Sequence, residues 1–175
     1  PKMPIMSFGS TPRIDRATWR LRIFGKVQTP IELTWDDYVS LTHEQLIADF
    51  HCVTQWTRLD VEWEGVSPSR VLEFAKPTLD AKFAMIHCYD GYTTNVDLPA
   101  LLQSGTLFAF QQQGIALANE HGGPLRLVVP TRYGWESAKW VKAVQLMGTD
   151  APGFWETHGY HMRGDPWREE RFSEY

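Results

Sequence analysis

Short apolar segments recur along the chain, and each is bounded by glycine, proline or a residue that caps helices. TWRLRIFG, residues 18–25, alternates large apolar with basic side chains and ends at Gly25, as a half-buried strand does. FAMIHCYDGYTTNVDL, residues 83–98, predicts a strand, a turn at Asp90 and Gly91, and a second strand with β-branched residues. Because these bounding residues end helices and strands, the sequence predicts only short helices and strands.

Helix signals stand between the strand signals. In LTWDDYVSL, Thr34 is placed to cap a short helix that begins with acidic residues. In SPSRVLEFAKP, Ser67 is the expected cap, Pro68 fits the first helical position, and Pro77 stops the helix. PALLQSG, residues 99–105, predicts a further brief helix.

Three more segments read as strands: TLFAFQQQG at residues 106–114, GGPLRLVVP at 122–130 and WVKAVQLMG at 140–148. Short strands with short helices between them predict an α+β fold, mixed and rich in β-structure. We expect one domain over residues 1–175. Residues 152–175 lack periodicity but contain several aromatic side chains, so we expect a C-terminal tail that wraps the domain.

Composition excludes several classes of function. A chain of 175 residues can bury a sizeable core without disulfides. The net charge of −4 provides no basic field for nucleic acid, so no nucleic-acid partner is expected. No segment approaches the ~20 apolar residues of a membrane span, and the N-terminal residues lack the layout of a secretory signal. We therefore expect a cytoplasmic protein without a membrane span.

The chain has two cysteines, Cys52 and Cys88, and each follows a histidine. Neighbouring side chains of an extended segment point to opposite faces, so a histidine and the adjacent cysteine do not readily share a zinc ion. Cys52 could be a core residue, a nucleophile or a metal ligand. Cys88 belongs to no motif, and we expect it in the core.

NEHGGPLRLVVPTRYGWESAKW, residues 119–140, carries the strongest chemical signal. It combines hydrogen-bond donors suited to phosphate with glycines that let the backbone approach an anion. The residues concerned are His121, Gly122, Gly123, Arg126, Arg132, Ser137 and Lys139. The alternative is that the glycines are turn residues and the basic side chains lie on the surface. Neither a Walker loop nor a dinucleotide fingerprint occurs.

Several motifs in a fixed order carry a resemblance to a known family. They are HCVTQW, WEGV, HGGPLRLVVP, SAKWVKAVQL and GFWETHGY. Together they resemble the molybdopterin-binding domain of the sulfite oxidase family, in particular its short single-domain members. The likeness extends over about residues 5 to 170, and the motifs are far more specific jointly than singly.

The resemblance implies a cofactor site. Cys52 matches the cysteine that binds molybdenum in the family. His121 and Arg126 match residues that contact the pterin and its phosphate, and Ser137 and Lys139 complete the phosphate site. A single soft thiolate suits a high-valent molybdenum held by the dithiolene of one pterin.

The resemblance also implies catalytic positions. Tyr160 matches an active-site tyrosine near the metal, and Arg58 follows Cys52 at about the distance of a substrate-binding arginine. Ser7 and Asp90 are weaker matches to cofactor-contacting positions. Where the family has an arginine pair after its cysteine, this chain has Thr57 and Arg58, so we expect weak sulfite oxidation.

The sequence therefore predicts a mononuclear molybdenum oxidoreductase that uses one-pterin molybdopterin and catalyses oxygen-atom or electron transfer on a small substrate, such as an S-oxide or N-oxide. No C-x-x-C-H haem motif occurs, so we expect no haem and a separate electron-transfer partner. Two alternatives remain open. One is a hydrolase with Cys52 as nucleophile and His121 as base, and the other is an anion-binding module without redox activity.

Overall fold

The computed structural model describes residues 3–7 and 9–173. The strands of the described chain are β1 (Arg20–Gly25), β2 (Ile31–Thr34), β3 (Glu44–Cys52), β4 (Trp56–Val66), β5 (Phe83–Cys88), β6 (Thr93–Asp97), β7 (Leu107–Gln112), β8 (Ile115–Ala116), β9 (Arg126–Val128) and β10 (Val141–Met147). The helices are α1 (Trp35–Val39), α2 (Pro68–Ala75) and α3 (Leu98–Leu102), with 3₁₀ turns η1 (Asn119–His121), η2 (Glu156–His158) and η3 (Pro166–Arg168). The sheet-rich fold confirms the predicted class.

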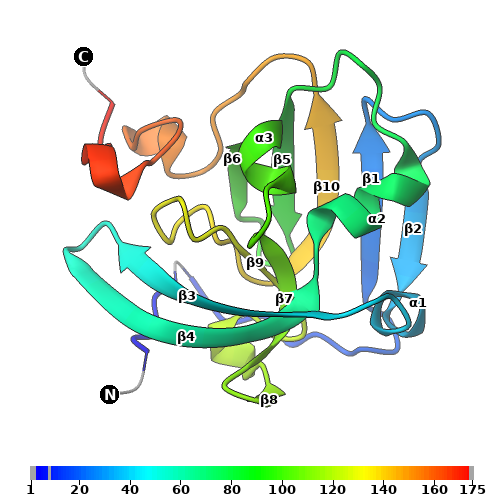
Figure 1. Cartoon of the computed structure of the whole chain (residues 1–175), viewed down its shortest axis with the longest axis horizontal. Helices are drawn as coiled ribbons and strands as arrows, with labels where there is room; N and C mark the ends of the chain where they lie inside the picture. Colours follow the sequence, from blue (N-terminus) through cyan, green and yellow to red (C-terminus); the bar gives the residue numbers. More distant parts are fainter. Residues whose placement is uncertain (1–2, 8, 174–175) are drawn as a thin grey trace.

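Two sheets form the body of the protein (Figure 1). The first has the order β2-β1-β10-β5-β6. Its strands β1 and β10 are parallel, in a register that pairs Arg22 with Ala143, although 115 residues lie between the end of β1 and the start of β10. The second has the order β3-β4-β7-β8, with β9 paired to β7. Strands distant in sequence thus meet in both sheets.

The main core lies where the two sheets face one another. Trp19 just before β1, Ile23 and Val144 from the first sheet, and Phe108 and Leu127 from the second are fully buried in one cluster. Burial of each large apolar side chain contributes about 1.5–3 kcal/mol to folding. The hydroxyl of Tyr38 on α1 also reaches the second sheet, where it donates to the Phe108 carbonyl and accepts from the Val66 amide at 3.2 Å.

The helices begin largely as the sequence predicts. Thr34 and Asp37 form a complete capping box at the start of α1. Helix α2 starts at Pro68 after Ser67, but the Ser67 side chain makes no capping hydrogen bond, so that part of the prediction is wrong. Proline at the first helical position has no N–H, so one fewer amide at this end of α2 needs a partner. No helix of the described chain is long and apolar enough to cross a membrane.

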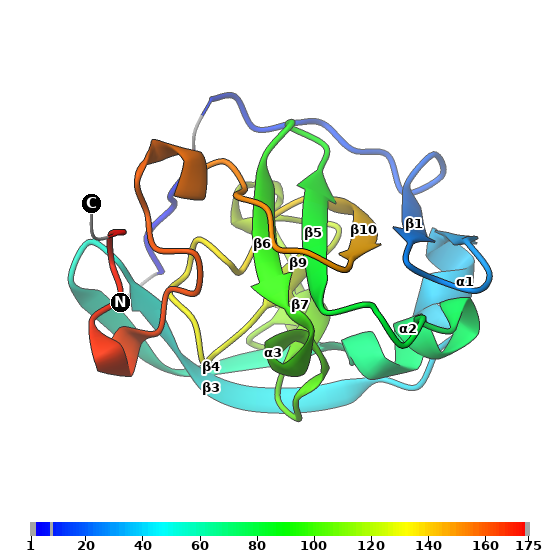
Figure 2. The same cartoon turned by 90° about the horizontal axis from the view of Figure 1, so that it is seen from above.

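The hairpin of β3 and β4 is the longest feature of the fold, and the C-terminal tail lies beside its tip in both views (Figures 1 and 2). The tail folds back on itself through a β-bridge between Tyr160 and Phe172. The backbone amide of Tyr133 donates to the Gly164 carbonyl at 2.8 Å and fixes the tail to the body. Cys52 is the last residue of β3.

Candidate active site

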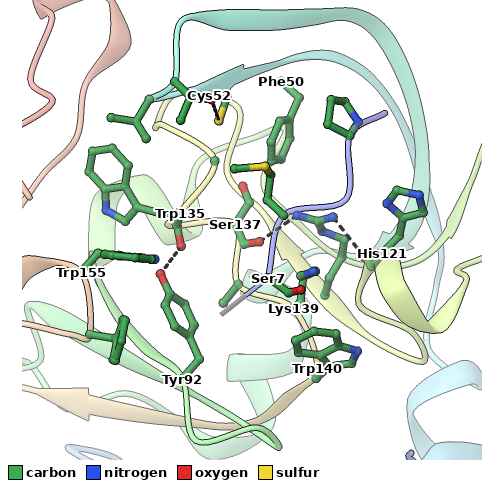
Figure 3. A pocket seen from close by; sticks show the side chains of 18 of the residues that line it. Ser7, Phe50, Cys52, Tyr92, His121, Trp135, Ser137, Lys139, Trp140 and Trp155 are labelled. Atoms are coloured by element: carbon green, nitrogen blue, oxygen red, sulfur yellow. Dashed lines mark hydrogen bonds between the residues drawn. The ribbon is translucent and has the colours of Figure 1, made fainter. Parts of the chain in front are cut away.

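A cavity of about 390 Å³ opens between the hairpin tip, the segment 120–140 and the tail (Figure 3). It brings together nearly all of the residues singled out in the sequence: Ser7, Cys52, Asp90, His121, Arg126, Ser137, Lys139 and Tyr160. Arg58 and Arg132 do not line the cavity, and Arg58 instead pairs with Phe50 in the β3–β4 hairpin. These positions are up to 153 residues apart in sequence (Ser7 to Tyr160), so only the tertiary fold unites them.

Cys52 ends β3 opposite Trp56, in a tight turn closed by a 3.1 Å hydrogen bond from the Gln55 amide to the Cys52 carbonyl. Its thiol is half-buried, and its Sγ lies 3.1 Å from the Thr54 hydroxyl oxygen. Cys88 is instead fully buried in the core, where burial raises the pKa of its thiol well above the usual value. Only Cys52 of the two thiols lines the cavity.

Arg126 forms part of the cavity floor and is only 3% exposed. Its guanidinium donates to the carbonyl oxygens of His121 at 3.0 Å and of Ser137 at 2.9 Å. It also lies over the rings of Phe50 and Trp63, at 5.3 and 5.2 Å from their centroids. Burial lowers the pKa of Arg126 to about 10, so the side chain stays cationic at neutral pH.

Lys139 contributes a second cation to the cavity. Its Nζ donates to the Glu120 carbonyl at 2.9 Å and lies 4.4 Å from the Trp140 ring centroid. Burial, together with the charge of Arg126, lowers the pKa of Lys139 to about 8. Within residues 3–7 and 9–173, neither Lys139 nor Arg126 forms an ion pair with a carboxylate. Two partly or fully buried cations without an ion-paired carboxylate favour an anionic ligand.

The electrostatics at His121 agree with this conclusion. Burial lowers the pKa of His121, and the charges of Arg126 and Lys139 lower it further. Gly122, with φ of +103°, packs so closely that an added Cβ would lie 2.9 Å from carbon atoms of Lys139 and 3.0 Å from the Arg126 Cβ. The glycine therefore lets the backbone turn directly behind both cations.

Ser137, Asp90 and Ser7 have different surroundings. The buried Ser137 hydroxyl accepts a 3.0 Å hydrogen bond from the Val129 amide, and it retains its own proton for donation. Asp90 lies in the β5–β6 turn and accepts from the Tyr92 amide at 3.0 Å. Ser7 is exposed and belongs to the N-terminal segment at the cavity mouth.

Aromatic side chains form the wall beside Tyr160. Its ring stacks on Trp155, with centroids 5.0 Å apart, and meets the edge of Trp135 at 4.9 Å. Burial raises the pKa of Tyr160, and the nearby Cys52 adds to this effect. Trp135 is itself held at both ends, because Glu156 accepts from its indole nitrogen at 2.8 Å and Tyr92 donates to its carbonyl at 2.8 Å.

Sequence reasoning missed Trp135, Tyr92 and Glu156 as parts of this wall. The motif GFWETHGY contains Glu156, but nothing in the local pattern shows that its carboxyl faces an indole 21 residues earlier. Sequence reasoning also grouped Arg132 with the anion-binding donors, which is wrong. Arg132 pairs with Asp97 at 2.6 Å and does not line the cavity.

The cavity thus presents a thiol at one side and cations at the other, and aromatic side chains also line it. In Figure 3, Cys52 lies at the upper edge, whereas His121 and Lys139 lie toward the right and below. A phosphorylated, planar heterocyclic cofactor has matching chemistry: an anion for the cations, a ring system for the aromatic walls and a soft metal for the thiolate. The residues present therefore fit a molybdopterin.

Comparison with known proteins agrees with this geometry. The family model described as oxidoreductase molybdopterin binding domain matches residues 8–155. The chain belongs to this oxidoreductase family. The matched range contains Cys52, Arg126 and Lys139, whereas Tyr160 and most of the tail lie beyond it. Oxidoreductase activity with molybdopterin is accordingly the family's chemistry.

Curated relatives extend the comparison. The uncharacterized oxidoreductase YuiH of Bacillus subtilis is 40% identical over 171 residues, which cover 97% of this chain and 86% of that protein. The catalytic subunit MsrP of the protein-methionine-sulfoxide reductase of Campylobacter jejuni is 29% identical over 157 residues, covering 80% of this chain. The putative protein-methionine-sulfoxide reductase subunit YedZ1 of Azospira oryzae is 28% identical over 151 residues, covering 86%. The chain spans 52% of MsrP and 57% of YedZ1.

Among solved structures, the sulfane dehydrogenase SoxCD of Paracoccus pantotrophus superposes with a TM-score of 0.73. The match covers 79% of this chain and 40% of that chain, at 23% sequence identity. This likeness establishes that the two share a fold. It confirms the predicted sulfite-oxidase-type arrangement of strands.

Proposed function

We propose that this protein is a molybdenum enzyme that reduces S-oxides, using molybdopterin in its one-pterin form. The observation that carries the proposal is the convergence of one thiol and two cations without carboxylate partners on a single cavity. Family membership supplies the cofactor class. The names of MsrP and YedZ1 supply the substrate class, because both refer to methionine sulfoxide.

The thiol, the cations and the aromatic side chains of the cavity have distinct roles in this proposal. Cys52 provides the thiolate ligand of molybdenum, and Arg126, Lys139 and Ser137 hold the phosphate. His121 and the aromatic wall contact the pterin. When bound, the cofactor supplies the redox chemistry, cycling between oxidation states that differ by two electrons.

The protein's own residues orient the substrate and exclude water. Reduction of an S-oxide breaks the S–O bond, consumes two electrons and two protons, and releases the sulfide and water. Tyr160, between two tryptophans, can hold its hydroxyl toward the substrate oxygen, and burial raises its pKa so that it keeps its proton. The apolar rings around it suit the carbon substituents of a neutral S-oxide.

Charge distribution favours a neutral substrate over sulfite. The cavity cations Arg126 and Lys139 have the cofactor phosphate as their proposed counter-charge, and Arg58 is not part of the lining. A small dianion would therefore lack an arginine contact, which costs about 1.5–3 kcal/mol, or a factor of about ten to a hundred in affinity. We propose that electrons come from a separate partner protein, as the subunit names of the relatives also suggest.

The hydrolase alternative has less support. Cys52 contacts Thr54, and in the described part of the chain no hydrogen bond joins its thiol to His121. Activation of a nucleophilic thiol by histidine requires such a contact.

Protein purified from molybdate-replete cells tests the proposal. Elemental analysis and pterin fluorescence should give about one molybdenum and one pterin per chain. Steady-state assays with an artificial electron donor should show turnover of methionine sulfoxide and dimethyl sulfoxide well above that of trimethylamine N-oxide, and sulfite oxidation with an artificial acceptor should be weak. A metal-free protein after this preparation would support the non-redox binding module, and micromolar sulfite affinity with rapid turnover would contradict the S-oxide assignment.

A further inference from the structure

The turn that carries Cys52 contacts the C-terminal tail on the side away from the cofactor cavity. A second, polar cavity lies there, lined by His51, Cys52, Tyr133, Glu169 and Arg171 among others. Cys52 thus belongs to the lining of both cavities. Whatever fixes the outer side of the turn also fixes the thiol on its inner side.

Arg171 makes the central contact of this outer side. Its Nη1 donates to the Val53 carbonyl, directly after Cys52, and its Nε pairs with Glu169 at 2.8 Å. The guanidinium also lies over the Tyr133 ring at 4.8 Å, and the side chain is 21% exposed. One planar group therefore joins the turn, the tail and the segment before Trp135, as the fork of arginine allows and the single ammonium of lysine does not.

Two further contacts connect the tail and its neighbouring segment to the same turn. The His51 ring meets the edge of Trp167 with centroids 5.2 Å apart. The His51 carbonyl accepts a 2.7 Å hydrogen bond from the Gly134 amide, beside Tyr133. The residues on both sides of Cys52 are thus held from outside, whereas within the turn the Gln55 amide supplies a local bond.

We infer that Arg171 is a positioning residue for the Cys52 thiol, and that the tail is part of the active centre. The effect of Arg171 on catalysis rests on the proposed function. Its effect on the position of the Cys52 thiol does not. Without the Val53 contact, the turn gains freedom that the ladder of β3 and β4 does not remove, because Val53 and Thr54 lie outside both strands. The thiol should then move relative to the cavity.

Alkylation of the cofactor-free protein by iodoacetamide, followed by peptide mass spectrometry, tests the inference without any metal. Arg171→Ala should increase the rate at Cys52 by about tenfold, as expected for the loss of one charge-assisted hydrogen bond. Arg171→Lys should give an intermediate rate. The matched control is Arg168→Ala, since Arg168 is exposed and pairs with Asp165 within the tail.

Cys88 is an internal reference in the same sample, because it reacts only if the core opens. If Arg171→Ala also makes Cys88 reactive, the Cys52 alkylation rates of the wild type and Arg171→Lys are compared instead. In the cofactor-loaded enzyme, Arg171→Ala should also alter the Mo(V) electron paramagnetic resonance signal and lower kcat more than it changes KM. Equal Cys52 alkylation rates in wild type and an Arg171 variant that keeps Cys88 protected would overturn the inference. A wild-type protein without molybdenum would overturn the proposed function instead, and the alkylation result would still stand.

Discussion

The Arg126 guanidinium donates a 2.9 Å hydrogen bond to the carbonyl oxygen of Ser137, and this bond joins β9 to the segment that carries Lys139. The Ser137 hydroxyl in turn accepts from the Val129 amide, so the two segments are tied in both directions. Because the Arg126 guanidinium donates its hydrogen bonds to neutral carbonyl oxygens, its positive charge is not neutralised and remains available to an anionic ligand. The cation cluster is therefore prepared before an anion binds.

Removal of either cation should weaken cofactor retention. Arg126→Ala and Lys139→Ala each delete a charge-assisted contact worth about 1.5–3 kcal/mol, so pterin dissociation should become about ten to a hundred times more favourable. Pterin fluorescence after dialysis measures the effect. Lys142→Ala is the matched control, because Lys142 lies 6.0 Å from the Tyr89 ring and does not line the cavity. Full occupancy in both site variants would refute the anion site.

Cys52→Ser should abolish S-oxide reduction while leaving the fold intact. The replacement is nearly isosteric at a half-buried turn position, but an alcohol does not replace a thiolate as a soft ligand. Absorption and paramagnetic resonance spectra should lose the features of sulfur from the cysteine. Cys88→Ala, in the core, should keep both spectrum and activity at a modest cost in stability. An active Cys52→Ser enzyme would exclude Cys52 as the essential ligand.

The strand-turn-strand of residues 83–98 was predictable because its alternation and its turn at Asp90 and Gly91 are local signals, and β5 and β6 confirm it. The long β3–β4 hairpin was not predicted. Its outward positions carry charged residues such as Glu62, and a register shift after Ala48, with a positive φ at Asp60, interrupts the alternation. Periodicity alone therefore fails where a bulge exchanges the two faces.

The candidate site was predictable only through the joint motifs. Their order identified Cys52, Arg126 and Lys139, which the fold then brings to one cavity. The pairing of Arg132 with Asp97 and the contact of Arg171 with the Val53 carbonyl join residues 35 and 118 positions apart. No local pattern encodes such contacts, because they depend on how the tail and sheets pack.

Tyr38→Phe should lower the stability of the fold without changing the cofactor site. The fully buried hydroxyl serves both the Phe108 carbonyl and the Val66 amide at the junction of β4 and β7. Its removal leaves buried polar groups without this partner, at a cost of about 1–3 kcal/mol. Urea denaturation measures the loss. Tyr89→Phe, at a partly buried hydroxyl near Arg20, should cost less, and an unchanged midpoint for Tyr38→Phe would contradict the role of the bridge.

Gly122→Ala should impair cofactor retention more than its backbone strain explains. The new methyl group would lie 2.9 Å from Lys139 and 3.0 Å from Arg126, so both cations must shift. Gly114→Ala is the control, because Gly114 also has positive φ, +72°, but an added Cβ there meets no atom within 4 Å. Both variants should lose roughly 1 kcal/mol of stability to strain. Only Gly122→Ala should lose pterin, and equal retention would separate Gly122 from the site.

Cofactor retention should depend on pH through Lys139. Burial and the charge of Arg126 lower the pKa of Lys139 to about 8, and only the ammonium form attracts a phosphate. Below that pH the contact is present, and above it the contact weakens as the proton is lost. Because a bound anion favours the charged form, binding also takes up a proton and moves the transition to higher pH.

Pterin release should therefore accelerate as the pH rises above 8, with a midpoint at or above the value of the empty site. Fluorescence-monitored dissociation at a series of pH values measures it. Lys139→Arg should remove the dependence in this range, since a guanidinium keeps its proton, even though the geometry of the contact changes. Lys142→Arg should leave the wild-type profile unchanged. A wild-type release rate that is independent of pH would show that another group controls the anion site. A pH dependence that keeps the same midpoint in Lys139→Arg would show the same.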